Sequence, residues 1–367
     1  MAYINFKPSD FFSTKPFSGT GSAQSITGVG FQPDFSYIKC ISNGEYWNLT
    51  DSPRGVTKNL STNVNAAETT LAGATGRITS FDVDGFSLGT NDQTNLSGGD
   101  FVSYNMKMGT TSGKPTVGET ITPTAYSINT TVGQGIYKYT GTGANGAIAH
   151  GLSSAPEVVI VKKTSGVEEW VFGGTMLTSG AYKLVMNTTA AQLSEAGAFN
   201  STFPSSTVVS LGTSGGTNTS TGGYIMYAFA PVKGYSKFGA YQGTGDVNSQ
   251  YIYTGFQPSW VMIKKTNSTG GWYIRNISQS ASGTTPYIGN VGGATSGYGK
   301  LQYVYANSDG VTTTSNTTGD DIISFTSTGF QVTCTATGNN AASSNYIYMA
   351  FAEKPLIGSG GTTGVAL

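Results

Sequence analysis

The chain has 367 residues, of which 19 are basic and 19 acidic; these make up 10% of the chain, and the formal net charge is zero. A neutral chain lacks the basic surface that binds nucleic-acid phosphates. The sequence also contains no run of 18 apolar residues, the length that a helix needs to cross a membrane. Residues 1–17 also lack the basic and apolar regions of a signal peptide. The 52 glycines, with many Ser, Thr and Asn, favour short strands joined by tight turns over long helices.

The same unit occurs three times along the chain. Each repeat opens with Gly-Thr-Gly, at residues 19–21, 141–143 and 243–245, and continues with a proline, a short apolar run and a tryptophan. In every repeat the tryptophan comes 14 residues after the proline, an agreement that chance rarely produces three times. The prolines are Pro33, Pro156 and Pro258, the tryptophans are Trp47, Trp170 and Trp272, and aromatic-rich segments close the repeats at 101–108, 224–230 and 346–352.

The pattern inside each repeat predicts strands. The apolar runs 35–39, 158–163 and 260–265 are short and rich in β-branched and aromatic residues, which is typical of strands buried on both faces. Turn residues follow each run and indicate a hairpin, and a second hairpin is indicated at 81–86 and at 325–330. The sequence therefore predicts an all-β protein of three tandem β-sandwich domains of about 100–120 residues, each with its own core.

The predicted organisation has six parts. They are an N-terminal attachment arm (1–14), a first β-sandwich repeat (15–112), a linker (113–133), second and third repeats (134–235 and 236–357) and a mobile tail (358–367). The arm is expected to attach the protein to a larger assembly through its apolar side chains, which are Tyr3, Ile4, Phe6, Phe11 and Phe12. The alternative is that this segment supplies an edge strand to the first repeat.

Residues suited to catalysis or metal binding are few. His150 is the one histidine and has no counterpart in the other repeats, so it is predicted to be a turn residue rather than a base. Cys40 and Cys334 form neither a disulfide framework nor a metal-binding motif. Asp82 and Asp84 have a spacing that calcium sites use, but the third repeat has threonines there, so the turn does not need the acids. We expect no catalytic residue, no metal, no cofactor and no enzymatic activity.

Ligand contacts are expected on loops that differ among the repeats, because the shared positions are used by the core. Two stretches qualify, 46–58 in the first repeat and 278–300 in the third. The expected contact residues carry hydrogen-bonding groups or stacking rings and are Tyr46, Asp51, Arg54, Tyr273, Arg275, Tyr287 and Tyr298. The three tryptophans, by contrast, occupy the same place in every repeat and are predicted to be core anchors.

Several motifs resemble those of a known family. They are residues 1–12, the Gly-Thr-Gly starts, and residues 30–35, 51–58, 80–86 and 346–352. In these motifs the chain resembles the tandem-repeat virion proteins of tailed, especially marine, bacteriophages, which are described as tail-fibre or structural surface proteins. The resemblance implies a homo-oligomer, with a trimer favoured, that is assembled in the host cytoplasm and contacts other proteins of the tail or capsid.

The same resemblance implies a function in host adsorption. The protein would be a virion surface structural protein, tail-fibre-like, which presents its β-sandwiches to a host surface glycan or protein. Two alternatives remain open. One is a capsid decoration or cement protein (a head fibre); the other is a polysaccharide-degrading tailspike, which would need a pair of carboxylates in a groove.

Overall fold

The computed structural model describes residues 4–247, 250–277, 301–311, 313–315 and 323–354. Most regular elements in these residues are antiparallel β-strands, so the prediction of an all-β protein is confirmed. The helices are single turns: η1 (Pro8–Asp10), η2 (Gly73–Thr75), α1 (Asp92–Asn95) and α2 (Gly215–Asn218). Within the described residues, no helix has the length and apolar character that crossing a membrane requires.

A larger sheet of the same strand order occurs in each of the three repeats. Four strands lie side by side in the same order in every repeat: the first strand, the closing strand, the strand that follows the proline, and the strand that begins at or next to the tryptophan. In repeat 1 these are β1 (Phe12–Ser18), β9 (Asp100–Met106), β3 (Phe35–Cys40) and β4 (Asn48–Asp51); in repeat 2 they are β11 (Gln134–Thr140), β18 (Gly223–Phe229), β13 (Val158–Lys163) and β14 (Trp170–Gly174); in repeat 3 they are β19 (Ser236–Gln242), β27 (Asn345–Phe351), β21 (Trp260–Lys265) and β22 (Trp272–Asn276).

Further strands extend two of these sheets. They are β10 (Ala125–Asn129), β15 (Tyr182–Val185) and β16 (Leu193–Ser194) in repeat 2, and β23 (Leu301–Tyr305) and β24 (Thr313–Ser315) in repeat 3. A separate pair of short strands, β5 (Lys58–Asn59) and β6 (Thr69–Thr70), belongs to repeat 1.

A smaller sheet lies against one face of each larger sheet. It consists of β2 (Gln24–Thr27), β8 (Gly85–Leu88) and β7 (Ile78–Asp82) in repeat 1, of β12 (Gly146–Ala149) and β17 (Val208–Leu211) in repeat 2, and of β20 (Gln250–Tyr253), β26 (Gly329–Val332) and β25 (Ile323–Thr326) in repeat 3. The two hairpins predicted at 81–86 and 325–330 are β7–β8 and β25–β26.

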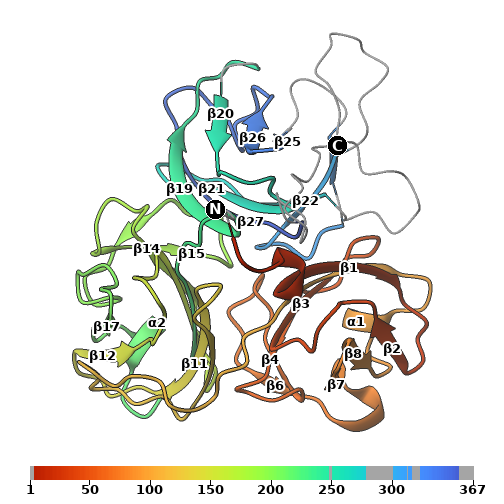
Figure 1. Ribbon diagram of the computed structural model, residues 1–367, viewed down its shortest axis with the longest axis horizontal. Helices are drawn as coiled ribbons and strands as arrows, with labels where there is room; N and C mark the ends of the chain where they lie inside the picture. Colours follow the sequence, from red (N-terminus) through yellow and green to blue (C-terminus); the bar gives the residue numbers. More distant parts are fainter. Residues whose placement is uncertain (1–3, 248–249, 278–300, 312, 316–322, 355–367) are drawn as a thin grey trace.

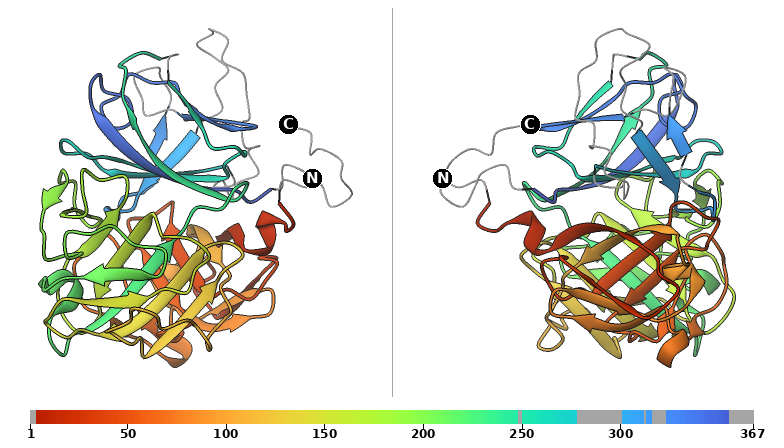
Figure 2. Two further views of the ribbon diagram at one scale, coloured as in Figure 1. Left: turned by 60° about the vertical axis from the view of Figure 1, so that its left-hand side comes forward. Right: turned by 90° about the vertical axis from the view of Figure 1, so that its right-hand side faces the viewer.

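Each larger sheet is buried on both faces because it separates two apolar clusters. In β3, Phe35 and Tyr37 belong to a central cluster, whereas Ile38 and Cys40 contact the smaller sheet of repeat 1. Strands β13 and β21 alternate in the same way. The central cluster contains side chains of all three repeats, so the repeats share one core in addition to the separate cores that the sequence predicts. Figures 1 and 2 show the three lobes gathered around this common centre.

The Gly-Thr-Gly signature ties the end of the first strand to the turn before the closing strand. A Cβ atom on Gly19 would lie 2.1 Å from the Leu96 carbonyl oxygen, and Gly21 has a φ of 69°, so neither position suits a side chain. Between them the Thr20 amide donates to Oδ1 of buried Asn95 at 2.8 Å. Asn218 and Asn340 do the same for Thr142 and Thr244.

Two segments predicted to lie outside the sandwiches contribute strands to them. The predicted linker 113–133 contains β10, and its Ile121 and Ile128 are buried in the cluster of repeat 2, so it is not an extended connection. The predicted arm 1–14 contains the start of β1, which forms the edge of its sheet as the alternative interpretation expects. The predicted tail, 358–367, lies outside the described residues.

Candidate functional site

The three tryptophans are core anchors, as predicted, and they also join the repeats. Their side chains are no more than 1% exposed. Each indole Nε1–H donates to a backbone carbonyl of a different repeat: Trp47 to Tyr305 at 2.8 Å, Trp170 to Ser61 at 2.9 Å and Trp272 to Val185 at 3.1 Å. Repeat 1 therefore binds repeat 3, repeat 2 binds repeat 1, and repeat 3 binds repeat 2. The contacts close a ring with pseudo-threefold order.

Three buried lysines repeat the same cyclic order. Lys39, Lys162 and Lys264 are fully buried, and each ammonium donates to a carbonyl of the neighbouring repeat, of Asp309 at 2.9 Å, Asn65 at 3.3 Å and Thr189 at 3.3 Å respectively. Each also donates to the carbonyl of the next residue in its own chain segment. Burial lowers the pKa of all three lysines to about 8. These lysines therefore join the repeats in the same direction as the tryptophans.

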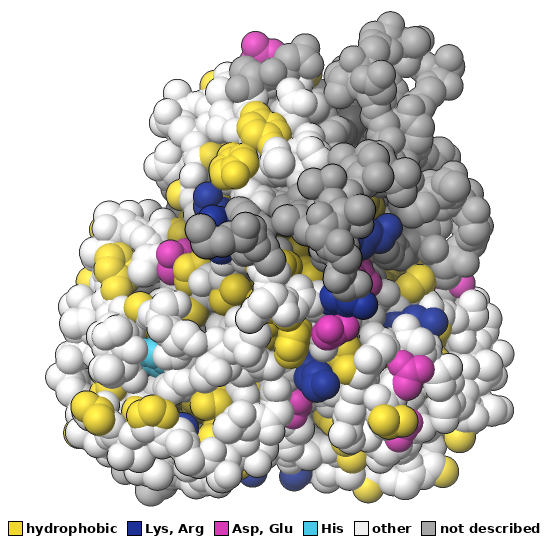
Figure 3. Space-filling view, viewed as in Figure 1, with side chains coloured by type: hydrophobic (Ala, Val, Ile, Leu, Met, Phe, Trp, Pro, Cys, Tyr) yellow, Lys and Arg dark blue, Asp and Glu magenta, His cyan; other side chains and the backbone are white. Residues whose placement is uncertain are grey.

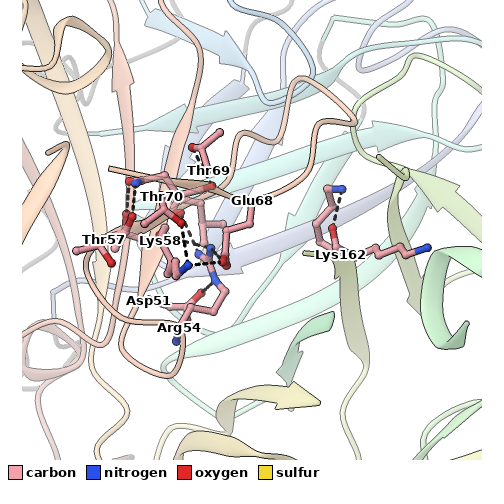
Figure 4. A network of polar contacts seen from close by, with 12 residues as sticks. Asp51, Arg54, Thr57, Lys58, Glu68, Thr69, Thr70 and Lys162 are labelled. Carbon is pink, nitrogen blue, oxygen red and sulfur yellow. Dashed lines mark hydrogen bonds and ion pairs between the residues drawn. The ribbon is translucent and has the colours of Figure 1, made fainter. Parts of the chain in front are cut away.

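A buried ionic network also joins repeats 1 and 2. The Asp51 carboxylate accepts from the Arg54 Nε at 2.7 Å and from the Tyr227 hydroxyl of repeat 2 at 2.7 Å. Arg54 also pairs with Glu68 at 3.2 Å, and Lys58 with Glu68 at 3.6 Å (Figure 4). Burial lowers the pKa of Arg54, but the neighbouring carboxylates of Asp51 and Glu68 raise it above its usual range, so the guanidinium stays charged.

This geometry corrects the predicted ligand contacts in repeat 1. Asp51 is 0% exposed and Arg54 is 5% exposed, so neither side chain is available to a ligand from solvent. Their hydrogen-bonding groups are occupied within the protein, where they fix the loop 51–58 against repeat 2. Tyr46, which is 41% exposed, remains at the surface.

The predicted contacts in repeat 3 are corrected in the same way. Tyr273 and Arg275 are 7% and 1% exposed, and the guanidinium carbon of Arg275 lies 4.6 Å from the centroid of the Tyr303 ring. Their side chains therefore stabilise the pairing of β22 with β23 instead of facing a ligand. Tyr287 and Tyr298 lie outside the described residues.

The apolar residues of the predicted attachment arm pack against the central core. The Phe12 ring is fully buried and stacks on Phe351 of repeat 3, with centroids 5.6 Å apart. Phe6 meets Phe11 edge to face at 5.4 Å, and it also contacts the Tyr235 ring at 5.9 Å. Ile4 is half-buried, and Tyr3 lies outside the described residues. This segment closes the seam where the first and third repeats meet.

The residues considered for chemistry have structural partners. His150 is fully buried, its Nδ1 accepts from the Leu152 amide at 3.0 Å, and burial lowers its pKa. The Asp84 carboxylate accepts from the amides of Gly28 and Gly30, and these bonds lower its pKa. Cys40 and Cys334 are buried thiols. In the described part of the chain, no three or more His, Cys, Asp or Glu residues gather as a metal ligand set.

A pair of exposed tyrosines on β20 was missed by sequence reasoning. Tyr251 and Tyr253 are 47% and 57% exposed, whereas Ile252 between them is 7% exposed. Figure 3 shows hydrophobic side chains gathered at the position of β20 on an otherwise largely uncharged face. Alternating burial in Gln250–Tyr253 is the signal that would have found the pair, since residues two apart on a strand share a face.

Comparison with known proteins identifies the family of the chain and no individual relative. The chain has no significant match among curated proteins or among solved structures. A family model described as "Domain of unknown function (DUF7483)" matches residues 7–355, which span all three repeats and the ring of contacts between them. The chain therefore belongs to the DUF7483 family.

Proposed function

We propose that this protein is a non-enzymatic structural protein of a phage virion surface, tail-fibre-like, which presents a rigid β-scaffold for host adsorption. The observation that supports this best is the closed ring of three repeats. Each repeat is joined to the next by one buried indole and one buried ammonium, so the body holds its loops in fixed relative positions. Variable loops on a rigid scaffold are a common arrangement for binding.

The surface composition agrees with an exposed position on a particle. Several of the few charged groups are buried, among them Lys39, Lys162, Lys264, Asp51 and Arg54. The face drawn in Figure 3 is accordingly dominated by uncharged groups. Interactions of such a surface depend little on ionic strength, because salt screens charges rather than apolar or hydroxyl contacts.

Localisation on the particle tests the proposal. Antibodies raised against the purified chain should label intact virions by immunogold electron microscopy, at the tail. Label that appears only after the particles are disrupted would contradict a surface function. A parallel measurement is adsorption of virions to host cells in the presence of excess purified chain, which should slow adsorption by competing for the same receptor.

A second candidate is a capsid decoration protein, which the pseudo-threefold order of the body favours. A body with three equivalent lobes matches the symmetry of a threefold position on a capsid shell. The segment before β1 lies where the lobes meet and offers a central point of attachment (Figure 1). Immunogold label on the head instead of the tail would select this candidate.

A further inference from the structure

Strand β20 presents two tyrosine rings on one face of repeat 3. Tyr251 and Tyr253 are two residues apart, so their side chains leave the same face of the strand about 7 Å apart. Both rings are about half exposed, at 47% and 57%. We infer that Tyr251 and Tyr253 form a stacking platform for a neutral glycan of hexopyranose units.

The fold itself does not require these rings. β2 and β12 are the register equivalents of β20, because all three pair with the second strand of the smaller sheet in the same way. The positions of Tyr251 and Tyr253 are occupied by Ser25 and Thr27 in repeat 1 and by Ala147 and Ala149 in repeat 2. Two repeats build this strand without an aromatic residue there. The strand therefore forms without these rings, and the pair in repeat 3 is open to a function besides folding.

The rings are held in place before any ligand arrives. The Tyr251 hydroxyl lies 2.6 Å from Thr328 Oγ1 and accepts from Thr326 Oγ1 at 3.3 Å. The ammonium of Lys237 lies 5.6 Å from the centroid of the Tyr253 ring. Fixed rings lose little side-chain entropy when a ligand binds, which raises affinity for a given contact area.

The chemistry around the rings suits a sugar better than a protein or a lipid surface. A tyrosine ring has an apolar face that covers the C–H face of a pyranose, and the flanking threonine hydroxyls can exchange hydrogen bonds with sugar hydroxyls. A stable protein interface buries more than about 1,000 Å² around an apolar centre, whereas two half-exposed rings offer far less. Binding to an anionic membrane would need a cluster of several basic residues, whereas one lysine of the described residues, Lys237, makes a cation–π contact with this pair.

This inference deepens the proposed adsorption function and rests on it, since a host surface glycan would be the ligand. The test uses the purified full chain and neutral hexopyranose oligosaccharides as probes, namely cellohexaose, maltohexaose and laminarihexaose. Binding is measured by saturation-transfer NMR and isothermal titration. The test variant is Tyr251→Ser with Tyr253→Thr, which installs the residues that repeat 1 carries at these positions. The control is Phe203→Ser, which removes an aromatic side chain of similar exposure, 40%, from repeat 2.

We expect the wild type and Phe203→Ser to bind at least one probe with equal affinity. The double variant should bind that probe at least about tenfold more weakly, with an unchanged melting temperature. Equal binding by the double variant, or no binding of any probe by the wild type, would overturn the platform. So would loss of binding in Phe203→Ser alone. The two proposals can be refuted separately. Immunogold label inside the particle would refute the adsorption function, whatever the oligosaccharides do. Label on the outside of the particle, together with no binding of any oligosaccharide, would refute only the stacking platform.

Discussion

The contact between Tyr227 and Asp51 offers a sharp test of how the repeats are joined. The Tyr227 hydroxyl donates to the Asp51 carboxylate across the boundary of repeats 1 and 2, and both side chains are buried. Tyr104 occupies the corresponding place in repeat 1, but its buried hydroxyl has no hydrogen-bond partner among the residues that the structure describes. Tyr227→Phe and Tyr104→Phe therefore make the same chemical change with opposite consequences.

The magnitudes follow from the hydrogen bonds that each variant removes. A hydrogen bond to a charged group contributes about 1.5–3 kcal/mol, and Asp51 keeps its two bonds from Arg54 in the Tyr227 variant, so we expect a loss near the lower end. Removing the unpartnered hydroxyl of Tyr104 relieves a desolvation cost, so stability should stay constant or rise by up to about 1 kcal/mol. The two variants should thus differ by roughly 2 kcal/mol.

The assay is equilibrium unfolding in guanidinium chloride, followed by tryptophan fluorescence and circular dichroism. The midpoint should fall for Tyr227→Phe and stay or rise for Tyr104→Phe, with the same dependence on denaturant. Equal losses in both variants would mean that the hydroxyls matter only for packing. That result would refute the assignment of the Asp51 network as a joint between repeats 1 and 2.

Three further predictions concern the ring and its core. Burial lowers the pKa of Lys39, Lys162 and Lys264 from 10.5 to about 8, so between these pH values the unfolded chain binds more protons than the folded chain. The free energy of unfolding should therefore rise with pH above 8. Near pH 10 the ionisation of tyrosines in the unfolded chain should reverse this trend. A lower unfolding midpoint at pH 9.5 than at pH 7.5 would contradict this. Deleting residues 1–13 removes Phe12 from the core and should lower the free energy of unfolding by about 3–5 kcal/mol. Deleting residues 1–5 should leave stability nearly unchanged. If the longer deletion is equally harmless, the edge strand does not stabilise the fold. Light scattering should give the mass of one chain, since the ring already closes within it; the mass of three chains would support the homotrimer implied by the resemblance instead.

The parts of the fold that could be predicted are those with a local signal. The runs at 35–39, 158–163 and 260–265 are short and continuously apolar, and a strand between two apolar clusters requires that pattern. The offset from proline to tryptophan identified the repeats because the hairpin between them has nearly the same length each time. Comparing the three repeats with one another therefore identifies shared positions in the way that an alignment of related proteins would.

The burial of Asp51 and Arg54 could not be predicted, because it depends on a partner far away in the sequence. Tyr227 lies 176 residues after Asp51, and no local feature shows that β18 will cover this loop. From the sequence alone, polar residues in a loop specific to one repeat therefore predict ligand contacts. The error for 113–133 has a related cause: its Gly, Thr and Pro content hides two isoleucines that complete the core of repeat 2.

The differences among the repeats separate structural positions from those open to another function. Where all three agree, as in the asparagine that binds the Gly-Thr-Gly amide, the residue completes the same turn three times and folding explains it. Where one differs and is buried, as with the Asp51 network, the difference makes one junction of the ring unlike the other two. Where one differs and is exposed, as with Tyr251, the hydroxyl bonds to Thr326 and Thr328 hold the ring in place but do not cover its exposed face. The corresponding positions of the other two repeats carry no aromatic residue, so this ring is a position open to a function besides folding. For that reason we propose repeat 3 as the place to search for a receptor contact.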